Sequence, residues 1–294
     1  MKRTLRRLFA LAVVAAIAAW FLTAPKVADP AIVAGITPDL ALGERAFIAG
    51  GCSSCHAAEG AEDRLTLSGG MALKSPFGTF YAPNISPSDQ GIGGWSALDL
   101  INAMQYGTSP EGKHYFPAFP YTSYQNARPE QLVSLHAYMQ TLPKDATPSR
   151  AHDVGFPFNI RRSLGGWKLL FMRKGWVVDP GDLTDEEKRG RYLAAALGHC
   201  AECHTPRNFL GGAKRSKWLS GAPNPAGKGE IPNITPGGLD WSEDEIVEYL
   251  TSGFTPDFDT VGGHMTAVVE NFAQLPEKDR AAIAAYLKRV PAQP

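Results

Sequence analysis

Two short motifs in this chain carry the residue types that can attach an iron-containing cofactor to a polypeptide. Each has the order cysteine, any two residues, cysteine, histidine, and they run from Cys52 to His56 and from Cys200 to His204. Two thiols at this spacing reach the two vinyl groups of one porphyrin, and the adjoining histidine then lies beneath the iron. The sequence therefore predicts two covalently bound haem c groups. The expected thioether-forming residues are Cys52, Cys55, Cys200 and Cys203, and the expected iron ligands are His56 and His204.

These four cysteines are the only ones among the 294 residues. Thioether formation would use every thiol and leave none for a disulfide. A C-x-x-C pair also occurs in thioredoxin-like redox sites and in half of many zinc sites. A histidine directly follows the second cysteine in both copies, which favours haem attachment over either alternative.

The N-terminus has the layout of an export signal, because basic residues precede an uninterrupted apolar run from Leu8 to Ala24. The basic residues are Lys2, Arg3, Arg6 and Arg7. At about 1.5 Å per residue the run reaches about 26 Å as a helix, slightly less than a bilayer core. Pro25 follows directly, and signal peptidase tolerates proline poorly just after its cut. We therefore expect residues 1–24 to remain as a signal-anchor helix with the N-terminus inside; the alternative is a cleaved signal.

Length and composition indicate a globular protein with two domains of ordinary size, because 44% of the residues are hydrophobic and 20% are charged. The formal net charge is zero, but four of the 29 basic residues lie in the leader, so 25 basic side chains face 29 acidic ones in the exported part. No basic stripe follows any segment. We therefore do not expect nucleic acid as a partner.

The two halves repeat the same elements in the same order, which indicates an internal duplication. A helix leads into each motif, around Gly43 and around Gly190. After each motif comes a Gly- and Pro-rich stretch that we expect to be loop, ending in Pro83 to Pro87 and in Pro232 to Pro236. Both of these short segments read Pro-Asn-Ile-Ser/Thr-Pro.

Two more helices are expected in each half. Trp95-Ser96 opens one over residues 97–105 and Trp241-Ser242 opens one over residues 243–251, with the serines as N-caps. Apolar residues at i, i+3, i+4 and i+7 predict closing helices over residues 129–142 and 276–290. This order resembles the class I cytochrome c fold. We expect an all-α protein with little β-structure: a signal-anchor (1–24), two tandem cytochrome c domains (25–145 and 181–294) and a linker strap (146–180).

A methionine before the last helix usually supplies the sixth iron ligand in domains of that type. Met265 has this position in the second half, and His264 is the nearest competing ligand. The matching position in the first half holds Phe119, which cannot bind iron. The sixth ligand there stays open between Met104, His114, Met71 and none. Because axial methionine raises the reduction potential, we expect the haem of the first half to have the lower potential.

Other residues around the expected haem sites can be assigned a role only as hypotheses. Proximal histidines commonly donate their other ring N–H to a carbonyl oxygen, and Pro83 and Pro232 lie where such carbonyls could come from. Trp95, Trp241 and Arg207 could face haem propionates, or could be ordinary packing residues.

Two further segments extend the resemblance to one family: Tyr121 to Tyr124 and Phe156 to Arg161. With the two C-x-x-C-H motifs and the repeated Pro-Asn-Ile-Ser/Thr-Pro signature, they are similar to the cytochrome c subunits of bacterial membrane-bound dehydrogenases that oxidise alcohols, gluconate or aldehydes. The resemblance implies that electrons come from a dehydrogenase catalytic subunit and pass to another cytochrome, a quinone or a terminal oxidase. It also implies the periplasmic side of the inner membrane, or the periplasm if the leader is cleaved.

Two alternatives concern particular segments. A first haem with an open coordination position could be the reaction centre of a dihaem enzyme, a peroxidase or a sulfur-compound oxidase, with Glu111, Lys113 and His114 in the relevant loop. A gas or redox sensor would need an output domain, which the motifs do not indicate.

The segment from Gly166 to Trp176 mixes aromatic and cationic residues. It could contact a membrane or a partner, or form a strap packed against both domains.

Overall fold

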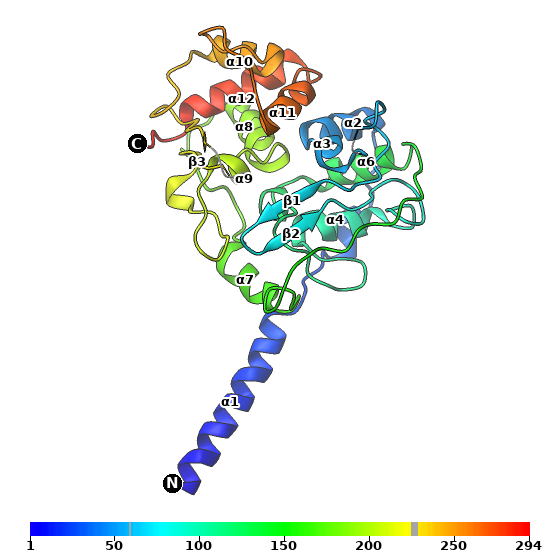
Figure 1. Ribbon diagram of the computed structural model, residues 1–294, viewed down its shortest axis with the longest axis vertical. Helices are drawn as coiled ribbons and strands as arrows, with labels where there is room; N and C mark the ends of the chain where they lie inside the picture. Colours follow the sequence, from blue (N-terminus) through cyan, green and yellow to red (C-terminus); the bar gives the residue numbers. More distant parts are fainter. Residues whose placement is uncertain (59, 225–228) are drawn as a thin grey trace.

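The computed structural model describes residues 1–58, 60–224 and 229–294. Figure 1 shows a long N-terminal helix, α1 (Lys2–Leu22), that projects from a helix-rich body. No residue of α1 is buried in the body, and among the described residues α1 is the one helix long and apolar enough to cross a membrane. Its length and place agree with the expected signal or anchor.

The body contains the predicted helices in both halves, here called the first half (residues 25–145) and the second half (residues 181–294). The helices of the first half are α2 (Leu40–Ala49), α3 (Cys52–His56), α4 (Ala97–Tyr106), α5 (Tyr121–Tyr124) and α6 (Pro129–Met139), with a 3-10 turn at Pro30–Val33. Those of the second half are α8 (Asp185–Tyr192), α9 (Ala201–His204), α10 (Glu243–Ser252), α11 (His264–Phe272) and α12 (Glu277–Arg289), with a π-helical stretch at Leu193–Leu197 and a 3-10 turn at Arg215–Lys217.

The starts of α4 and α10 follow from the capping chemistry that the sequence carries. Ser96 and Ser242 each accept a hydrogen bond from the backbone N–H three residues on, and the acidic residue there, Asp99 or Glu245, accepts one from the serine backbone N–H. These two capping boxes satisfy amide groups that a helix start would leave unpaired. Both predicted N-caps are confirmed.

The first and last helices of each half cross at a glycine. A Cβ on Gly43 of α2 would lie 2.1 Å from the Ser134 carbonyl oxygen on α6, and a Cβ on Gly190 of α8 would lie 1.7 Å from that of Ala282 on α12. Both distances are far below van der Waals contact, so only glycine permits this backbone approach. The duplicated sequence therefore builds the same helix crossing twice.

The expectation of loops after each motif is wrong at two short hairpins. In the first half β1 (Ala72–Ser75) pairs with β2 (Gly78–Tyr81), and in the second half β3 (Ala222–Pro223) pairs with β4 (Glu230–Ile231), both antiparallel. Residues 225–228 of the second stretch lie outside the described part of the chain. Strands of four and two residues are too short for a period of two to stand out in the sequence. The fold is mainly helical with these two small sheets.

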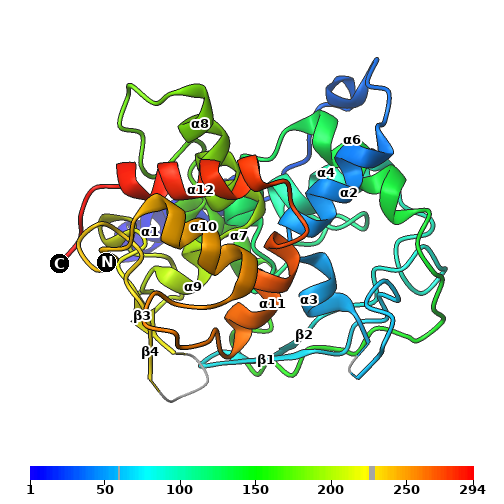
Figure 2. The ribbon, with the colours of Figure 1, turned by 90° about the horizontal axis from the view of Figure 1, so that it is seen from above.

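The two halves share one continuous core. Buried side chains of the first half, such as Phe47 and Leu132, belong to the same cluster as Leu193, Leu197 and Ile283 of the second half. All five residues of the π-helical stretch Leu193–Leu197 are buried, and this stretch contacts α2 and α5. Figure 2 shows the two halves side by side, with α11 next to α3.

Helix α7 (Ser163–Phe171) forms the middle of the segment between the halves, and it packs against both. The Lys168 ammonium donates hydrogen bonds to the carbonyl oxygens of Tyr106 (2.6 Å) and Gly107 (2.8 Å) in the first half. The Trp167 indole N–H donates to the Leu210 carbonyl oxygen in the second half at 2.9 Å. In Figure 1, α7 lies at the base of the body, where α1 departs.

Candidate functional site

The first C-x-x-C-H motif forms the short helix α3. Gly51 precedes it with a φ of +59°, a left-handed conformation that turns the chain between α2 and α3. The ring of His56 is half-buried, and its Nδ1 lies 2.8 Å from the carbonyl oxygen of Pro83. Loop residues 83–87 therefore fix the orientation of the expected proximal ligand.

The asparagine of the first Pro-Asn-Ile-Ser-Pro signature holds that carbonyl in place. The side-chain oxygen of Asn84 accepts from the backbone N–H of Ser86 at 2.8 Å. Its amide group donates to the carbonyl oxygens of Asp145 at 3.0 Å and Thr147 at 2.8 Å. Because Asn84 is buried and bonded on both sides, the turn that presents the Pro83 carbonyl is rigid.

The second half repeats this arrangement. Nδ1 of His204 lies 2.8 Å from the carbonyl oxygen of Pro232. Asn233 accepts from the backbone N–H of Thr235 at 2.9 Å and donates to the Gln293 carbonyl oxygen at 3.0 Å. The repeated signature therefore has a structural meaning, since its asparagine orients the carbonyl that orients the histidine.

These hydrogen bonds determine which ring nitrogen of each histidine is free. A carbonyl oxygen only accepts, so Nδ1 of His56 and of His204 must carry the proton and donate it. Nε2 then keeps its lone pair, which is the tautomer that binds a metal. Burial, the leading cause, lowers the pKa of both imidazoles and keeps them neutral. The sequence-based expectation for the Pro83 and Pro232 carbonyls is confirmed.

The thiols of both motifs lie in surroundings that disfavour the thiolate form. Burial raises the pKa of Cys52 and of Cys200 to about 12. Burial also raises the pKa of Cys55, and the thiol of Cys203 from the other half adds to that effect. A thioredoxin-like pair needs a lowered thiol pKa, so these sites do not resemble one. The effect of Cys203 on Cys55 also indicates that the two motifs lie close together.

We call the segment expected to supply the sixth iron ligand the distal segment. The distal segments of the two halves can be compared residue by residue, because the same short bridge occurs in both. Thr108 pairs with His114 in the first half, and Phe254 pairs with Thr260 in the second. Five residues after these bridges stand Phe119 and Met265. Met265 is the second residue of α11 and packs, partly buried, against the core, whereas its neighbour His264 is exposed. Phe119 therefore takes the place in the first half that Met265 takes in the second.

An aromatic shell surrounds Phe119. Its ring centroid lies 5.7 Å from those of Tyr115 and Tyr124 and 6.4 Å from that of Tyr121. Tilted and edge-on ring contacts of this kind stabilise a side chain by more than its buried apolar area alone would. The position that matches Met265 is thus surrounded by aromatic side chains in the first half.

The other candidate ligands of the first half have partners or positions of their own. Met104 is buried within α4 as part of the shared core, and Met71 is half-buried just before β1. His114 is buried rather than exposed, and its Nε2 donates to the carbonyl oxygen of Thr23 at 2.9 Å. His114 therefore connects the loop between α4 and α5 to the end of α1.

The contacts between the two motifs and the opposite halves were not foreseen from the sequence. Glu202, the residue before Cys203, accepts hydrogen bonds from the hydroxyl groups of Thr122 (2.9 Å) and Ser123 (3.0 Å) on α5. Ser54 has the same place in the first motif, and it accepts from the side-chain amide of Asn271 on α11 at 2.7 Å. Each attachment motif is therefore bound to the distal helix of the other half. We call these contacts the cross-clasp.

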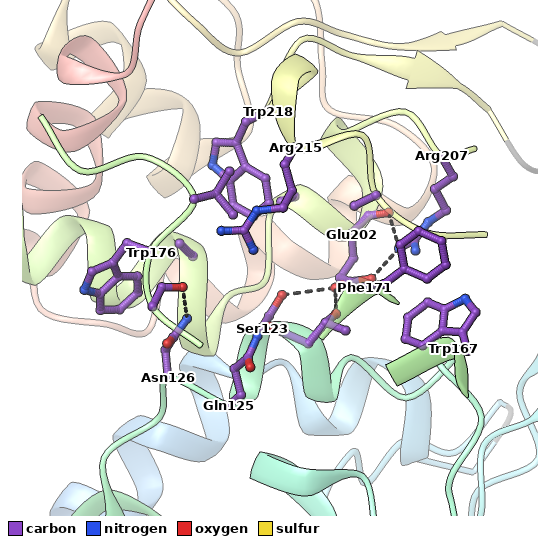
Figure 3. Close-up of a pocket in the computed structure, with 16 residues that line it drawn as sticks. Ser123, Gln125, Asn126, Trp167, Phe171, Trp176, Glu202, Arg207, Arg215 and Trp218 are labelled. Carbon is purple, nitrogen blue, oxygen red and sulfur yellow. Dashed lines mark hydrogen bonds and ion pairs between the residues drawn. The ribbon is translucent and has the colours of Figure 1, made fainter. Parts of the chain in front are cut away.

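Arg207 completes the Glu202 side of the cross-clasp rather than standing free. Figure 3 shows its guanidinium directed at the Glu202 carboxylate, with Ser123 on the other side. Although burial raises the pKa of Glu202, the nearby Arg207 and His199 and the hydrogen bonds lower it below its ordinary value. The carboxylate therefore stays charged and accepts from both halves.

The two tryptophans that open α4 and α10 are held alike by their closing helices. His136 on α6 donates to the carbonyl oxygen of Trp95 at 2.8 Å, and Lys288 on α12 donates to that of Trp241 at 2.7 Å. Both indole rings are partly buried against the shared core. Their packing accounts for their presence, and a role toward propionates stays a prediction.

Comparison with known proteins agrees with the duplicated architecture. A family model described as cytochrome c matches residues 40–143 and again residues 187–291. A protein of Cereibacter sphaeroides named "Diheme cytochrome c-type" is 56% identical over 295 residues, which cover 99% of both chains. The fructose dehydrogenase cytochrome subunit of Gluconobacter japonicus is 37% identical over 90% of this chain, and the gluconate 2-dehydrogenase cytochrome c subunit of Pantoea cypripedii is 34% identical over 85%. This chain covers 55% and 59% of these two subunits.

Proposed function

The chain belongs to the cytochrome c family, and we propose that it is an electron-transfer protein that receives electrons from a dehydrogenase and passes them to the respiratory chain. It carries two covalently bound haem c groups. The observation that carries the proposal is the pair of C-x-x-C-H motifs whose histidines both donate Nδ1–H to a proline carbonyl. Relatives that are cytochrome subunits of fructose and gluconate dehydrogenases support the dehydrogenase as donor.

Bound haem supplies a one-electron iron couple, and the surrounding residues decide where it sits and how easily it is reduced. Cys52 and Cys55, and likewise Cys200 and Cys203, would hold each group by two thioether bonds. The Pro83 and Pro232 carbonyls polarise His56 and His204 and make Nε2 a stronger donor. Met265 would offer its sulfur from α11. Phe119 offers no donor atom at the corresponding place.

A peroxidase or a sulfur-compound oxidase built on the first half finds no support. General acid–base catalysis needs a titratable group aimed at the reacting atoms. The Glu111 carboxylate accepts from the Ser109 hydroxyl at 2.7 Å, the Lys113 side chain is exposed, and the His114 ring is directed at Thr23. The relatives named above are also cytochrome subunits rather than peroxidases.

The topology that we propose keeps α1 as an anchor and places the body on the periplasmic side of the inner membrane. Four basic residues before the apolar run favour an N-terminus in the cytoplasm. We also propose domain boundaries at 25–145 and 181–294 around the linker strap 146–180, supported by the two ranges that the cytochrome c model matches. The electron acceptor would be another cytochrome, a quinone or a terminal oxidase.

The experiment starts from the full chain produced in a host that matures c-type cytochromes. We expect the mass to exceed that of the polypeptide by two haem groups. The double variant Cys52→Ala/Cys55→Ala and the double variant Cys200→Ala/Cys203→Ala should each lose one of them. Reduced by its dehydrogenase, the protein should donate electrons to membranes from the same cells. Absence of haem, or turnover of peroxide at a rate above that of free haem, would contradict the proposal.

A further inference from the structure

We propose that the underside of the body is a second membrane contact: an apolar face that lies on the outer surface of the bilayer and fixes the orientation of both halves. We call it the basal face. It consists of exposed apolar side chains from three segments that meet around α7: Phe156, Phe158, Ile160, Leu169, Leu170, Phe209 and Leu210. This inference rests on the proposed anchor role of α1, and it adds a lipid-binding surface to it.

Exposed apolar side chains are concentrated in this face. Beyond residues 1–22, the described residues include twelve large apolar side chains that are exposed, and seven of these belong to the basal face. Phe156 is 81% exposed and Phe209 is 87% exposed. Single exposed apolar residues are ordinary, whereas a contiguous patch marks an interaction surface.

The three segments are in direct contact, so the face is continuous. The ring of Phe158 lies 5.1 Å from that of Phe77 in the β1–β2 turn, in an edge-on contact. A Cβ on Gly211 would lie 3.0 Å from the same Phe77 ring, which places the Phe209–Gly211 loop beside it. The Trp167 indole then connects this loop to α7 through the carbonyl oxygen of Leu210.

The basal face adjoins the point where α1 leaves the body, and this decides in favour of lipid as its occupant. A Cβ on Gly165 of α7 would lie 2.1 Å from the carbonyl oxygen of Thr23, so the two backbones touch. The guanidinium of Arg162 lies 4.2 Å from the centroid of the Trp20 ring. Tryptophan near the end of a membrane helix lies at headgroup level. Arg162 and α7 must then lie at headgroup level too. The rest of the basal face is built around α7 and therefore lies at the same level.

The charge around the basal face fits a bilayer with anionic lipids. Residues 155–178 contain five basic side chains and no acidic one: Arg161, Arg162, Lys168, Arg173 and Lys174. Residues 204–223 contain four more, again without an acidic one: Arg207, Lys214, Arg215 and Lys217. The whole chain has equal numbers of acidic and basic residues, so these two segments carry a local excess of positive charge. Three of the nine side chains, Arg161, Lys168 and Arg207, are bonded within the body, which leaves six for lipid headgroups. Apolar side chains with basic neighbours are typical of segments that lie in the membrane interface.

The test places spin labels on the full haem-containing chain in nanodiscs of phosphatidylcholine and phosphatidylglycerol. All four native cysteines are used by haem, so an introduced cysteine is the single reactive one. We would label Phe156→Cys, Leu170→Cys and Phe209→Cys on the basal face. Phe258→Cys is the matched control. Phe258 is 89% exposed, but it lies outside the basal face, in the loop between α10 and α11. Val14→Cys in α1 reports on the anchor.

Accessibility to oxygen and to a water-soluble nickel chelate gives the depth of each label. We expect the three basal labels to lie roughly 5–10 Å into the interface, the Val14 label deeper, and the Phe258 label in water. Basal labels as accessible to nickel as the Phe258 label, with Val14 still in lipid, would overturn this inference and leave the anchor intact. A Val14 label in water would contradict the anchor itself. Basal labels that become protected only when the dehydrogenase is added would assign the face to a protein and also overturn the inference.

Discussion

The two halves hold their expected proximal ligands in the same way, but they differ at the position expected to supply the sixth iron ligand. His56 and His204 each donate Nδ1–H to a proline carbonyl at 2.8 Å. Five residues beyond equivalent bridges, the second half presents Met265 and the first half presents Phe119. The duplication has therefore kept the part that attaches and orients the cofactor. It has changed the residue at the position that is expected to set the reduction potential.

A second difference lies in how the distal segments are built. In the second half Met265 belongs to α11, a helix of nine residues. In the first half Phe119 precedes α5, a helix of four residues, and stands in a shell of tyrosines. Each of the two helices also binds the attachment motif of the other half. The segments that contain or follow the two compared positions therefore also hold the attachment motif of the other half.

The largest effect is expected from the glycines at the helix crossings. Gly43→Ala and Gly190→Ala should each lower the free energy of unfolding by about 3 kcal/mol or more, because a new Cβ would meet a backbone oxygen that cannot move aside alone. Urea unfolding followed by circular dichroism measures this. Gly94→Ala is the control, since its Cβ would meet no atom within 4 Å. If Gly43→Ala were as stable as the control, the close crossing would not be a shared requirement.

The next effect concerns the distal difference itself. Phe119→Met should give the first haem a sulfur ligand and raise its reduction potential, on the order of 100 mV within the range that axial ligation spans. Met265→Phe should lower that of the second haem by a similar amount. Potentiometric titration with visible and electron paramagnetic resonance spectra measures both. Phe119→Leu, which adds no donor atom, should leave the potential nearly unchanged.

The unaltered protein gives the sharpest check of the same comparison. We expect carbon monoxide to bind the reduced haem of the first half if no side chain replaces the missing methionine, and to leave that of the second half unchanged. Equal potentials in the two halves, or a higher one in the first, would show that another ligand has replaced the methionine. Such a result would contradict the expectation that the first haem has the lower potential.

A smaller effect is expected from the cross-clasp. Glu202→Ala would leave the hydroxyl groups of Thr122 and Ser123 and the guanidinium of Arg207 without their shared acceptor. We expect a loss of about 1–3 kcal/mol of stability, the usual result of leaving buried polar groups unpaired. Ser123→Ala and the double variant complete a mutant cycle, and a coupling energy near zero would contradict the contact. Ser54→Ala on the other side should cost about 1 kcal/mol.

The parts of the site that could be predicted from sequence are those that depend on neighbours along the chain. The C-x-x-C-H spacing defines the attachment chemistry, and the serine caps define where α4 and α10 begin. The position of Phe119 followed from counting along the duplication, and the bridges at Thr108 and Phe254 place it equally in space. Even the proline carbonyls could be proposed, because the same signature follows both motifs.

The parts that escaped depend on contacts between distant residues or on very short elements. Ser54 and Asn271 are 217 positions apart, and nothing in either neighbourhood indicates that they meet. His114 suggested a loop residue or an iron ligand, because the sequence could not show that the end of α1 would lie against it. The strands β3 and β4 have two residues each, too few for any pattern. These contacts and strands form only once the chain has folded and distant segments have come together.

The smallest expected effect concerns Lys168 of the strap, a half-buried cation that contacts the first half. Burial lowers the pKa of Lys168 from 10.5 to about 7, although its ammonium donates to the carbonyl oxygens of Tyr106 and Gly107 at the end of α4. Between these two pH values the unfolded chain binds more protons than the folded one. The contribution of Lys168 to stability should therefore rise as the pH increases from 7 toward 10, and it should not change further well below 7 because Lys168 is then charged in both states.

The size of this rise depends on how far the two carbonyl contacts offset the effect of burial on the Lys168 ammonium. We expect the free energy of unfolding to increase by an amount on the order of 1 kcal/mol between pH 7 and pH 9, since a tenfold change in a proton-binding constant corresponds to about 1.4 kcal/mol. Urea unfolding at both pH values measures it. Lys168→Met should remove this increase, whereas Lys217→Met, a change at an exposed lysine, should keep it. An equal increase in both variants would show that the strap holds Lys168 charged in the folded state, and that its contact with α4 is an ordinary ionic cap.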